Sequence, residues 1–153
     1  MAKFRFKYEA VLAQRQRAED AARRELAQWL DRDRALRDRL ASMQSDIRGS
    51  KRELGDALVG RVDLERVADF ARYSNHTTVH AQQLVQQLAA LHKDVEAARR
   101  RLMEASKQRK AMELLRDKHH AAWLAEQQRR EQREMDELAT QRHARQRASE
   151  ALS

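Results

Sequence analysis

Histidines are the side chains in this sequence best suited to metal chemistry, and two of them have the spacing of metal ligands. His76 and His80 lie four residues apart, so on a helix they point from one face. A zinc site needs further ligands, yet no carboxylate or third histidine falls on that face within one turn, and no HExxH motif occurs. We therefore interpret both as surface polar residues. His119 and His120 are adjacent, point in different directions, and receive the same interpretation.

Motifs of other catalytic or cofactor-binding sites are absent from the sequence. It has no Ser, His and Asp grouping typical of nucleophilic catalysis and no glycine-rich phosphate loop. The absence of cysteine excludes a disulfide framework and any cysteine-based zinc site. We predict no catalytic residues, no cofactor, no metal and no small-molecule substrate.

A basic stretch is the main sign of a charged partner. The formal net charge is +8, which favours a polyanion or an acidic protein surface. The densest cluster comprises Arg99, Arg100, Arg101, Lys107, Arg109 and Lys110. Such residues could contact phosphates, but they also suit the solvated exterior of a coiled coil, and no aromatic residue lies among them to stack on bases. A basic coiled-coil module that binds nucleic acid or ribosomes is thus the alternative function, and nucleic acid is the less favoured partner.

Two apolar seams with alternating spacings of three and four residues indicate the elements that carry these side chains. The first seam contains Ala22, Leu26, Trp29, Asp33, Leu36, Leu40, Met43, Ile47, Ser50 and Leu54. The second contains Val67, Phe70, Ser74, Thr77, Ala81, Leu84, Leu88, Leu91, Val95, Ala98, Leu102 and Ala105. A seam repeating every 3.5 residues is typical of one strand of a coiled coil. The absence of proline and the 37% of charged residues also favour long helices.

The glycines predict where the chain reverses. Gly49, Gly55 and Gly60 are the only three, and the segment 55–60 is the best candidate for a loop. Asp63 is a plausible N-cap for the second helix, and Glu65 is well placed in its first turn. We predict one domain over residues 1–153, an all-α antiparallel two-helix coiled-coil hairpin with helices over about 7–54 and 63–150 and a loop over about 55–62.

The pairing register follows from which seam positions face each other. We expect Trp29 opposite Leu88 and Leu36 opposite Ala81, while registers shifted by one heptad in either direction keep the seams facing equally well. In the expected register Asp33 faces Leu84. Phe4 would face about Glu113, leaving residues 114–150 overhanging and Trp123 without an intramolecular partner.

The overhang offers a surface for another protein. Its segment 125–134 has no large apolar residue, and the pairs Glu126–Arg130 and Arg130–Glu134 contribute only about 0.2–0.5 kcal/mol each. A two-helix hairpin has no enclosed pocket in which to shift pKa values, so we predict that the protein is not an enzyme. We also expect no signal peptide and no membrane-spanning segment.

Two passages resemble the flagellar export protein FliJ family. The first is FRFKYEAVLAQRQRAED, with Phe6, Ala10, Val11, Leu12 and Arg15. The second covers residues 102–139 and ends in EQREMDELA. Together with the length and the hairpin, they extend the resemblance over nearly the whole chain.

The resemblance implies a role in flagellum assembly, within the type III protein export apparatus. Family members are similar to the shaft of rotary ATPases, bind in the hexameric export ATPase ring, connect it to the membrane export gate and handle export chaperones. By this analogy the ATPase-contact residues are Gln132, Met135, Asp136 and Glu137, and the gate-contact residues are Phe70, Tyr73 and Thr77. The protein would then be cytoplasmic and peripheral on the inner side of the cell membrane. An injectisome counterpart is a close variant, and a homo-oligomer whose overhang pairs with its twin is a further alternative.

Overall fold

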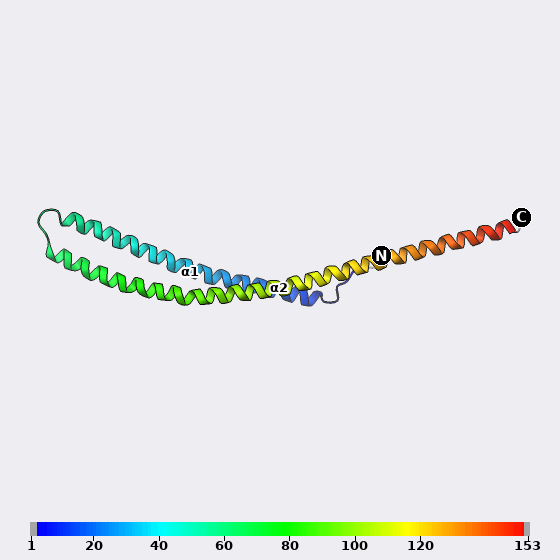
Figure 1. Cartoon of the computed structure of the whole chain (residues 1–153), viewed down its shortest axis with the longest axis horizontal. Helices are drawn as coiled ribbons and strands as arrows, with labels where there is room; N and C mark the ends of the chain where they lie inside the picture. The colour runs from blue at the N-terminus through cyan, green and yellow to red at the C-terminus, as the bar shows by residue number, and fades with distance from the viewer. Residues whose placement is uncertain (1–2, 152–153) are drawn as a thin grey trace. The chain divides into compact units, whose positions relative to one another are not determined.

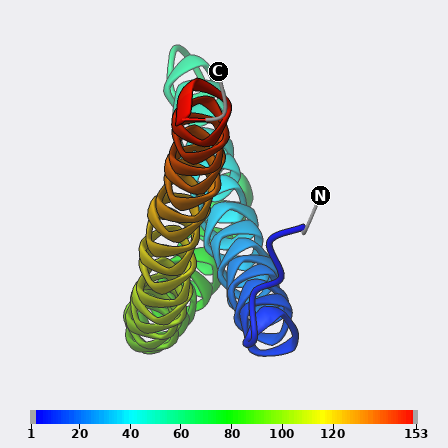
Figure 2. The same cartoon turned by 90° about the vertical axis from the view of Figure 1, so that its right-hand side faces the viewer.

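The computed structural model describes residues 3–151, and two long helices account for nearly all of them (Figure 1). Helix α1 comprises Glu9–Ala57 and helix α2 comprises Leu64–Ala151. The two pack against each other, and the described residues contain no strand. The predicted all-α helical hairpin is therefore confirmed. The segment before α1 is extended and is drawn in blue in Figure 2.

The chain divides into two compact units. The coiled-coil unit comprises residues 17–105 and includes the loop between the helices. The terminal unit comprises the described residues 3–16 and 106–151. Each unit contains part of α1 and part of α2, and in the coiled-coil unit these parts lie side by side (Figure 1).

The two predicted seams form the core of the coiled-coil unit. Every residue of both seams is buried or half-buried, whereas most residues between them are exposed. The deepest positions lie on α2: Leu84 is 1% exposed and Ala98 is 0% exposed. On α1 only Ala22 and Glu19 in this unit are buried, and the rest of the first seam is half-buried. The apolar spacing therefore identified the packed face of each helix correctly.

Helix α1 extends beyond its predicted end, and Gly55 lies inside it. Its last turn is continued by the Leu58 N–H, which donates to the Leu54 carbonyl at 3.0 Å. Of the three glycines only Gly60 has a positive φ, 106°, where a side chain would be strained. The placing of the loop start at Gly55 was thus wrong, while Gly60 does lie in the loop.

Asp63 caps the start of α2, as predicted. The Glu65 backbone N–H donates to Asp63 Oδ1 at 3.0 Å, which satisfies one of the amides that a helix N-terminus leaves without a partner. The Asp63 carbonyl accepts from the Val67 N–H at 3.3 Å, the first helical bond of α2.

The expected register was wrong by one heptad. Trp29 and Leu36 line a groove together with Gln87 and Leu91, whereas Ala81 lies beside Leu40 further along the unit. The later end of α1 explains the shift, because the loop that joins the helices is centred nearer Gly60 than the sequence suggested. The pairs observed belong to one of the two heptad-shifted alternatives, which the seam spacing alone could not distinguish.

The terminal unit has a small core of its own, formed where the start of the chain meets α2. Leu12 is 1% exposed and Phe6 is 5% exposed. The Arg15 guanidinium donates to Gln108 Oε1 at 2.6 Å, a pair that fits the shifted register. The partner of Phe4 is consequently not Glu113: its ring centroid lies 4.9 Å from that of His120. The unpaired part of α2 therefore starts beyond Trp123 and not at residue 114.

Candidate partner-binding surfaces

The last part of α2 is the largest surface without cover from the rest of the described chain. Every residue over 128–150 is exposed, and α2 stays helical to Ala151. Two large apolar side chains lie in this stretch: Met135 is 66% exposed and Leu138 is 51% exposed. Exposed apolar side chains on an otherwise polar helix mark a candidate site for protein binding.

The four proposed ATPase-contact residues all lie in this exposed stretch. Gln132, Met135 and Asp136 are spaced at i, i+3 and i+4, so they are neighbours on one side of α2. Glu137 lies one residue further around the helix. Gln132, Met135 and Asp136 therefore form a small, mostly polar surface on one side of α2, while Glu137, two residues after Met135, points from a different side.

Few intrahelical contacts tie down the side chains of this stretch. Arg130 Nε lies 3.4 Å from Glu126 Oε1, which is one of the two predicted pairs. For Glu134 the structure records no ion pair within the described residues, so the second predicted pair, Arg130–Glu134, is not formed. Thr140 Oγ1 donates to the Asp136 carbonyl at 2.8 Å. Most polar side chains here are consequently available to a partner.

Aromatic rings gather where residues 3–8 pass over α2 in the terminal unit. Phe6 contacts His119, with ring centroids 5.7 Å apart, and Phe4 contacts both His120 and Trp123. His120 also stacks on Trp123 at 6.0 Å. The expectation that Trp123 lacks a partner was therefore wrong, and the two histidines are packing residues as well as surface residues. The i, i+3 spacing of His120 and Trp123 was a signal that the sequence reasoning missed.

The three proposed gate-contact residues lie near the loop end of the coiled-coil unit, but they differ in exposure. Phe70 and Tyr73 line a groove of about 330 Å³ together with Leu54, Ala57 and Arg66. Tyr73 is 43% exposed. Thr77, by contrast, is 6% exposed and belongs to the packed seam. Only the first two present a surface that another protein could contact.

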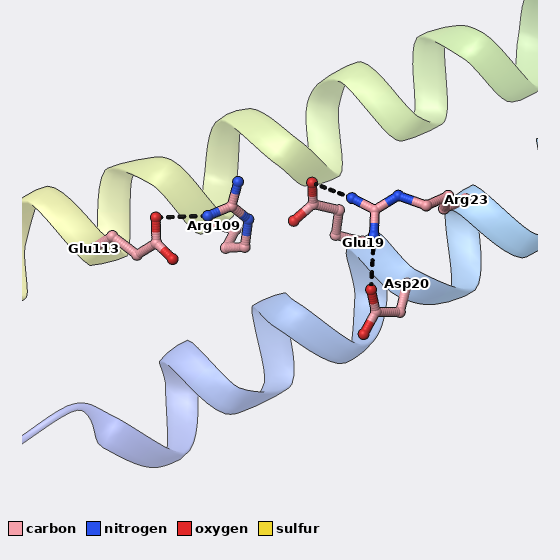
Figure 3. Close-up of polar contacts among 5 residues, drawn as sticks. All are labelled: Glu19, Asp20, Arg23, Arg109 and Glu113. Carbon is pink, nitrogen blue, oxygen red and sulfur yellow. Dashed lines mark hydrogen bonds and ion pairs between the residues drawn. The ribbon is translucent and has the colours of Figure 1, made fainter.

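Several arginines of the basic stretch are already paired with carboxylates. In the coiled-coil unit Arg99 pairs with Glu96 at 2.9 Å and Arg101 pairs with Glu25 at 2.7 Å. In the terminal unit Arg109 pairs with Glu113 at 2.5 Å (Figure 3). These pairs lower the positive charge that the stretch offers to phosphates, which weakens the case for nucleic-acid binding.

Carboxylates in the coiled-coil unit also pair with arginines, among them the buried Glu19 and the half-buried Asp33. Arg23 reaches both Glu19 and Asp20 at 3.1 Å, and Figure 3 shows its guanidinium between them. Asp33, a polar member of the first seam, accepts from Arg37 Nε at 2.6 Å. That hydrogen bond lowers the pKa of Asp33 below its ordinary value, with smaller favourable effects from the charges of Arg37 and His92. Asp33 thus stays charged at the seam edge.

Groups suited to metal chemistry do not assemble in the part of the chain that the structure describes. No cluster of three or more His, Cys, Asp or Glu side chains occurs there, and His76 is exposed while His80 is half-buried. Within residues 3–151, neither helix has a stretch both long and apolar enough to cross a membrane.

A comparison with protein families gives a match over nearly the whole chain. The family model described as "Flagellar FliJ protein" matches residues 4–148. Neither the search of curated proteins nor the search of solved structures returned a match. The matched region includes the aromatic cluster, both seams and nearly all of the exposed stretch.

Proposed function

Because the chain belongs to the flagellar FliJ family, it is a component of the flagellar export apparatus, and we propose that it acts there as a non-enzymatic central stalk of the export ATPase ring. In this role it links the ring to the cytoplasmic part of the export gate and escorts export chaperones. It works on the cytoplasmic side of the cell membrane as a peripheral protein. Family membership supports the assignment to the export apparatus, and the geometry of α2 supports the role of a stalk.

The observation that carries the proposal is the exposed stretch of α2 over residues 128–150. A single helix of this length that is polar on nearly all sides has little intrinsic stability to offer, since most helical stability in proteins comes from packing. The chain nevertheless continues it without a glycine or proline to Ala151. A socket supplied by another protein explains why the helix persists.

A ring of identical subunits is a suitable socket for such a helix. The exposed stretch presents charged and amide side chains around its circumference, with Met135 and Leu138 as isolated apolar positions. Mostly polar contacts of this kind are individually weak. They allow a single asymmetric helix to engage several equivalent subunits in turn, without a fixed match to the symmetry of the ring.

The gate contact is proposed for the loop end of the coiled-coil unit. Phe70 and Tyr73 are aromatic, line one groove, and lie next to the charged side chains of Arg66 and Asp69. An aromatic pair in a partly apolar groove with a polar rim is typical of protein interfaces. We assign Thr77 a packing role in the seam, because it is almost fully buried.

ATP hydrolysis by the export ATPase, measured with and without this protein, tests the stalk role. We expect the full chain to stimulate hydrolysis, and we expect stimulation to be lost when residues 125–153 are deleted. The point variant Met135→Glu should lower stimulation at least about tenfold, because it replaces the one apolar side chain of the proposed contact with a charge. Met103→Glu is the matched control, since Met103 is 67% exposed and Met135 is 66% exposed.

The two variants separate failure of the site from failure of the function. If Met135→Glu and Met103→Glu lowered the stimulation of ATP hydrolysis equally, with unchanged helicity by circular dichroism, the contact would lie elsewhere. Stimulation that persists after deletion of residues 125–153 would likewise show that the contact does not lie at the end of α2. No stimulation by the intact chain would contradict the stalk role itself.

A further inference from the structure

The end of α2 carries a seam of its own, and every member of this seam is exposed. Starting at Leu124, positions spaced alternately by four and three residues form one stripe along the helix. The stripe consists of Leu124, Gln128, Glu131, Met135, Leu138, Arg142, Arg145 and Ser149. Its three apolar members are 44%, 66% and 51% exposed in chain order. A heptad-spaced stripe is the pattern by which one helix pairs with another.

Charge is distributed unevenly along this stripe. Its acidic member, Glu131, precedes the apolar pair Met135 and Leu138, and its basic members, Arg142 and Arg145, follow that pair. All three charged residues are exposed. Within the described residues the structure records no ion pair for Glu131, Arg142 or Arg145. The stripe therefore has unmatched charges of opposite sign on either side of an apolar centre.

We propose that this stripe pairs with the same stripe of a second copy of the chain, in antiparallel orientation. When two copies are aligned about the midpoint between Met135 and Leu138, each Met135 faces Leu138 of the other copy. Glu131 then faces Arg142, and Gln128 faces Arg145, on both sides of the two-fold axis. Leu124 faces Ser149 at either end. One register thus satisfies the apolar centre and the flanking charges together.

The charge pattern selects the antiparallel arrangement over the parallel one. In a parallel pair the same residues face each other, so Glu131 would face Glu131 and Arg142 would face Arg142. Like charges at facing positions of a helix pair oppose association, and opposite charges favour it. The self-complementary surface is also what a two-fold symmetric dimer requires.

The pairing is weak enough to be reversible. Each copy contributes only three apolar residues to the seam, and the ion pairs lie at seam positions, where the loss of hydration on pairing offsets much of their attraction. Met135 lies at the centre of the pairing and also in the proposed ATPase-contact surface, so the two complexes exclude each other. This exclusion rests on the proposed stalk function, whereas the pairing itself does not.

Charge reversal tests the pairing by sedimentation of the purified full chain, with no ATPase present. We expect the intact protein to sediment with a weight-average mass that rises above 18.0 kDa with concentration. Glu131→Arg alone and Arg142→Glu alone should each weaken association about tenfold, because each turns both symmetric ion pairs into repulsions. An equimolar mixture of the two variants should recover association, since every facing pair in the mixed dimer is again of opposite charge.

Cysteine cross-linking tests the orientation, and the chain has no native cysteine to interfere. A mixture of Gln128→Cys and Arg145→Cys should form a mixed disulfide under mild oxidation. Gln128→Cys alone should not, because two copies of position 128 would lie about 25 Å apart in the antiparallel pair. Equally efficient cross-linking by Gln128→Cys alone would indicate a parallel pair and overturn the proposal. A chain that stays monomeric at every concentration, or a charge-swapped mixture that does not recover, would also overturn it, and none of these results depends on the ATPase.

Discussion

Two parts of helix α2 have the same secondary structure but differ in whether another helix of the chain packs against them. Over residues 67–105 a seam residue recurs every three or four positions and packs against α1, so that Leu84 is 1% exposed. Over residues 128–150 every side chain is exposed, and the large apolar residues Met135 and Leu138 stand alone. The first part derives its stability from a second helix within the chain. The second has helical backbone bonds but no tertiary packing, so we assign it to binding.

The largest expected difference between the two parts is in the response to truncating a leucine. Leu84→Ala should lower the free energy of unfolding by about 2–4 kcal/mol, because it removes a fully buried side chain from the seam. At concentrations where the protein is monomeric, Leu138→Ala should change it by less than about 0.5 kcal/mol, because that side chain is 51% exposed in the single chain. Urea unfolding followed by circular dichroism measures both. Similar losses in the two variants would mean that the end of α2 is packed in the isolated protein.

The paired helices and the loop that joins them should respond oppositely to alanine in place of glycine. Gly60→Ala should destabilise by about 1 kcal/mol, since φ at this position is 106° and a side chain is strained there. Gly55→Ala should stabilise by about 0.5–1 kcal/mol, since Gly55 is helical. A Cβ at either site meets nothing within 4 Å, so the difference isolates the backbone. Thermal unfolding of the two variants measures both changes in stability. A change of the same sign in both would contradict the position of the loop.

The smallest expected effect concerns the charge at the edge of the seam. The pKa of Asp33 is lowered by its hydrogen bond to Arg37, so folding favours the ionised carboxylate. The resulting stabilisation is fully present above the ordinary carboxyl pKa and is lost as the pH falls through the lowered value. Asp33→Asn should therefore flatten the acid limb of the stability profile, and Arg37→Met should do the same by removing the donor. An unchanged profile in both variants would show that the pair contributes nothing in solution.

Sequence patterns predicted the parts of the fold that depend on local spacing. The seams, the cap at Asp63 and the turn at Gly60 were all recognisable, because each reflects the chemistry of a residue and its near neighbours. The register was not, since a shift by a heptad leaves every seam position facing another seam position. The contacts of Trp123 depended on that register, so the sequence placed it on the unpaired helix while the structure places it against Phe4.

The surfaces proposed for binding also include features that the sequence predicted and features that it could not. The exposed position of Met135 could be predicted, because the segment before it has too few apolar residues to form a core. The burial of Thr77 was implied by its place in the seam, yet the family resemblance assigned it to a contact surface. The aromatic contacts of His119 and His120 could not be predicted, since they join residues at the two ends of the sequence.

The sequence by itself determined that this protein is a pair of long helices with one packed face each, because the period of apolar residues is a property of the chain. Only the tertiary structure decided which residues face each other and where α2 loses its partner. The reason is that helix pairing is degenerate at heptad intervals. The choice among those registers depends on how far α1 extends before the loop, and that extension is settled by the packing of both helices together.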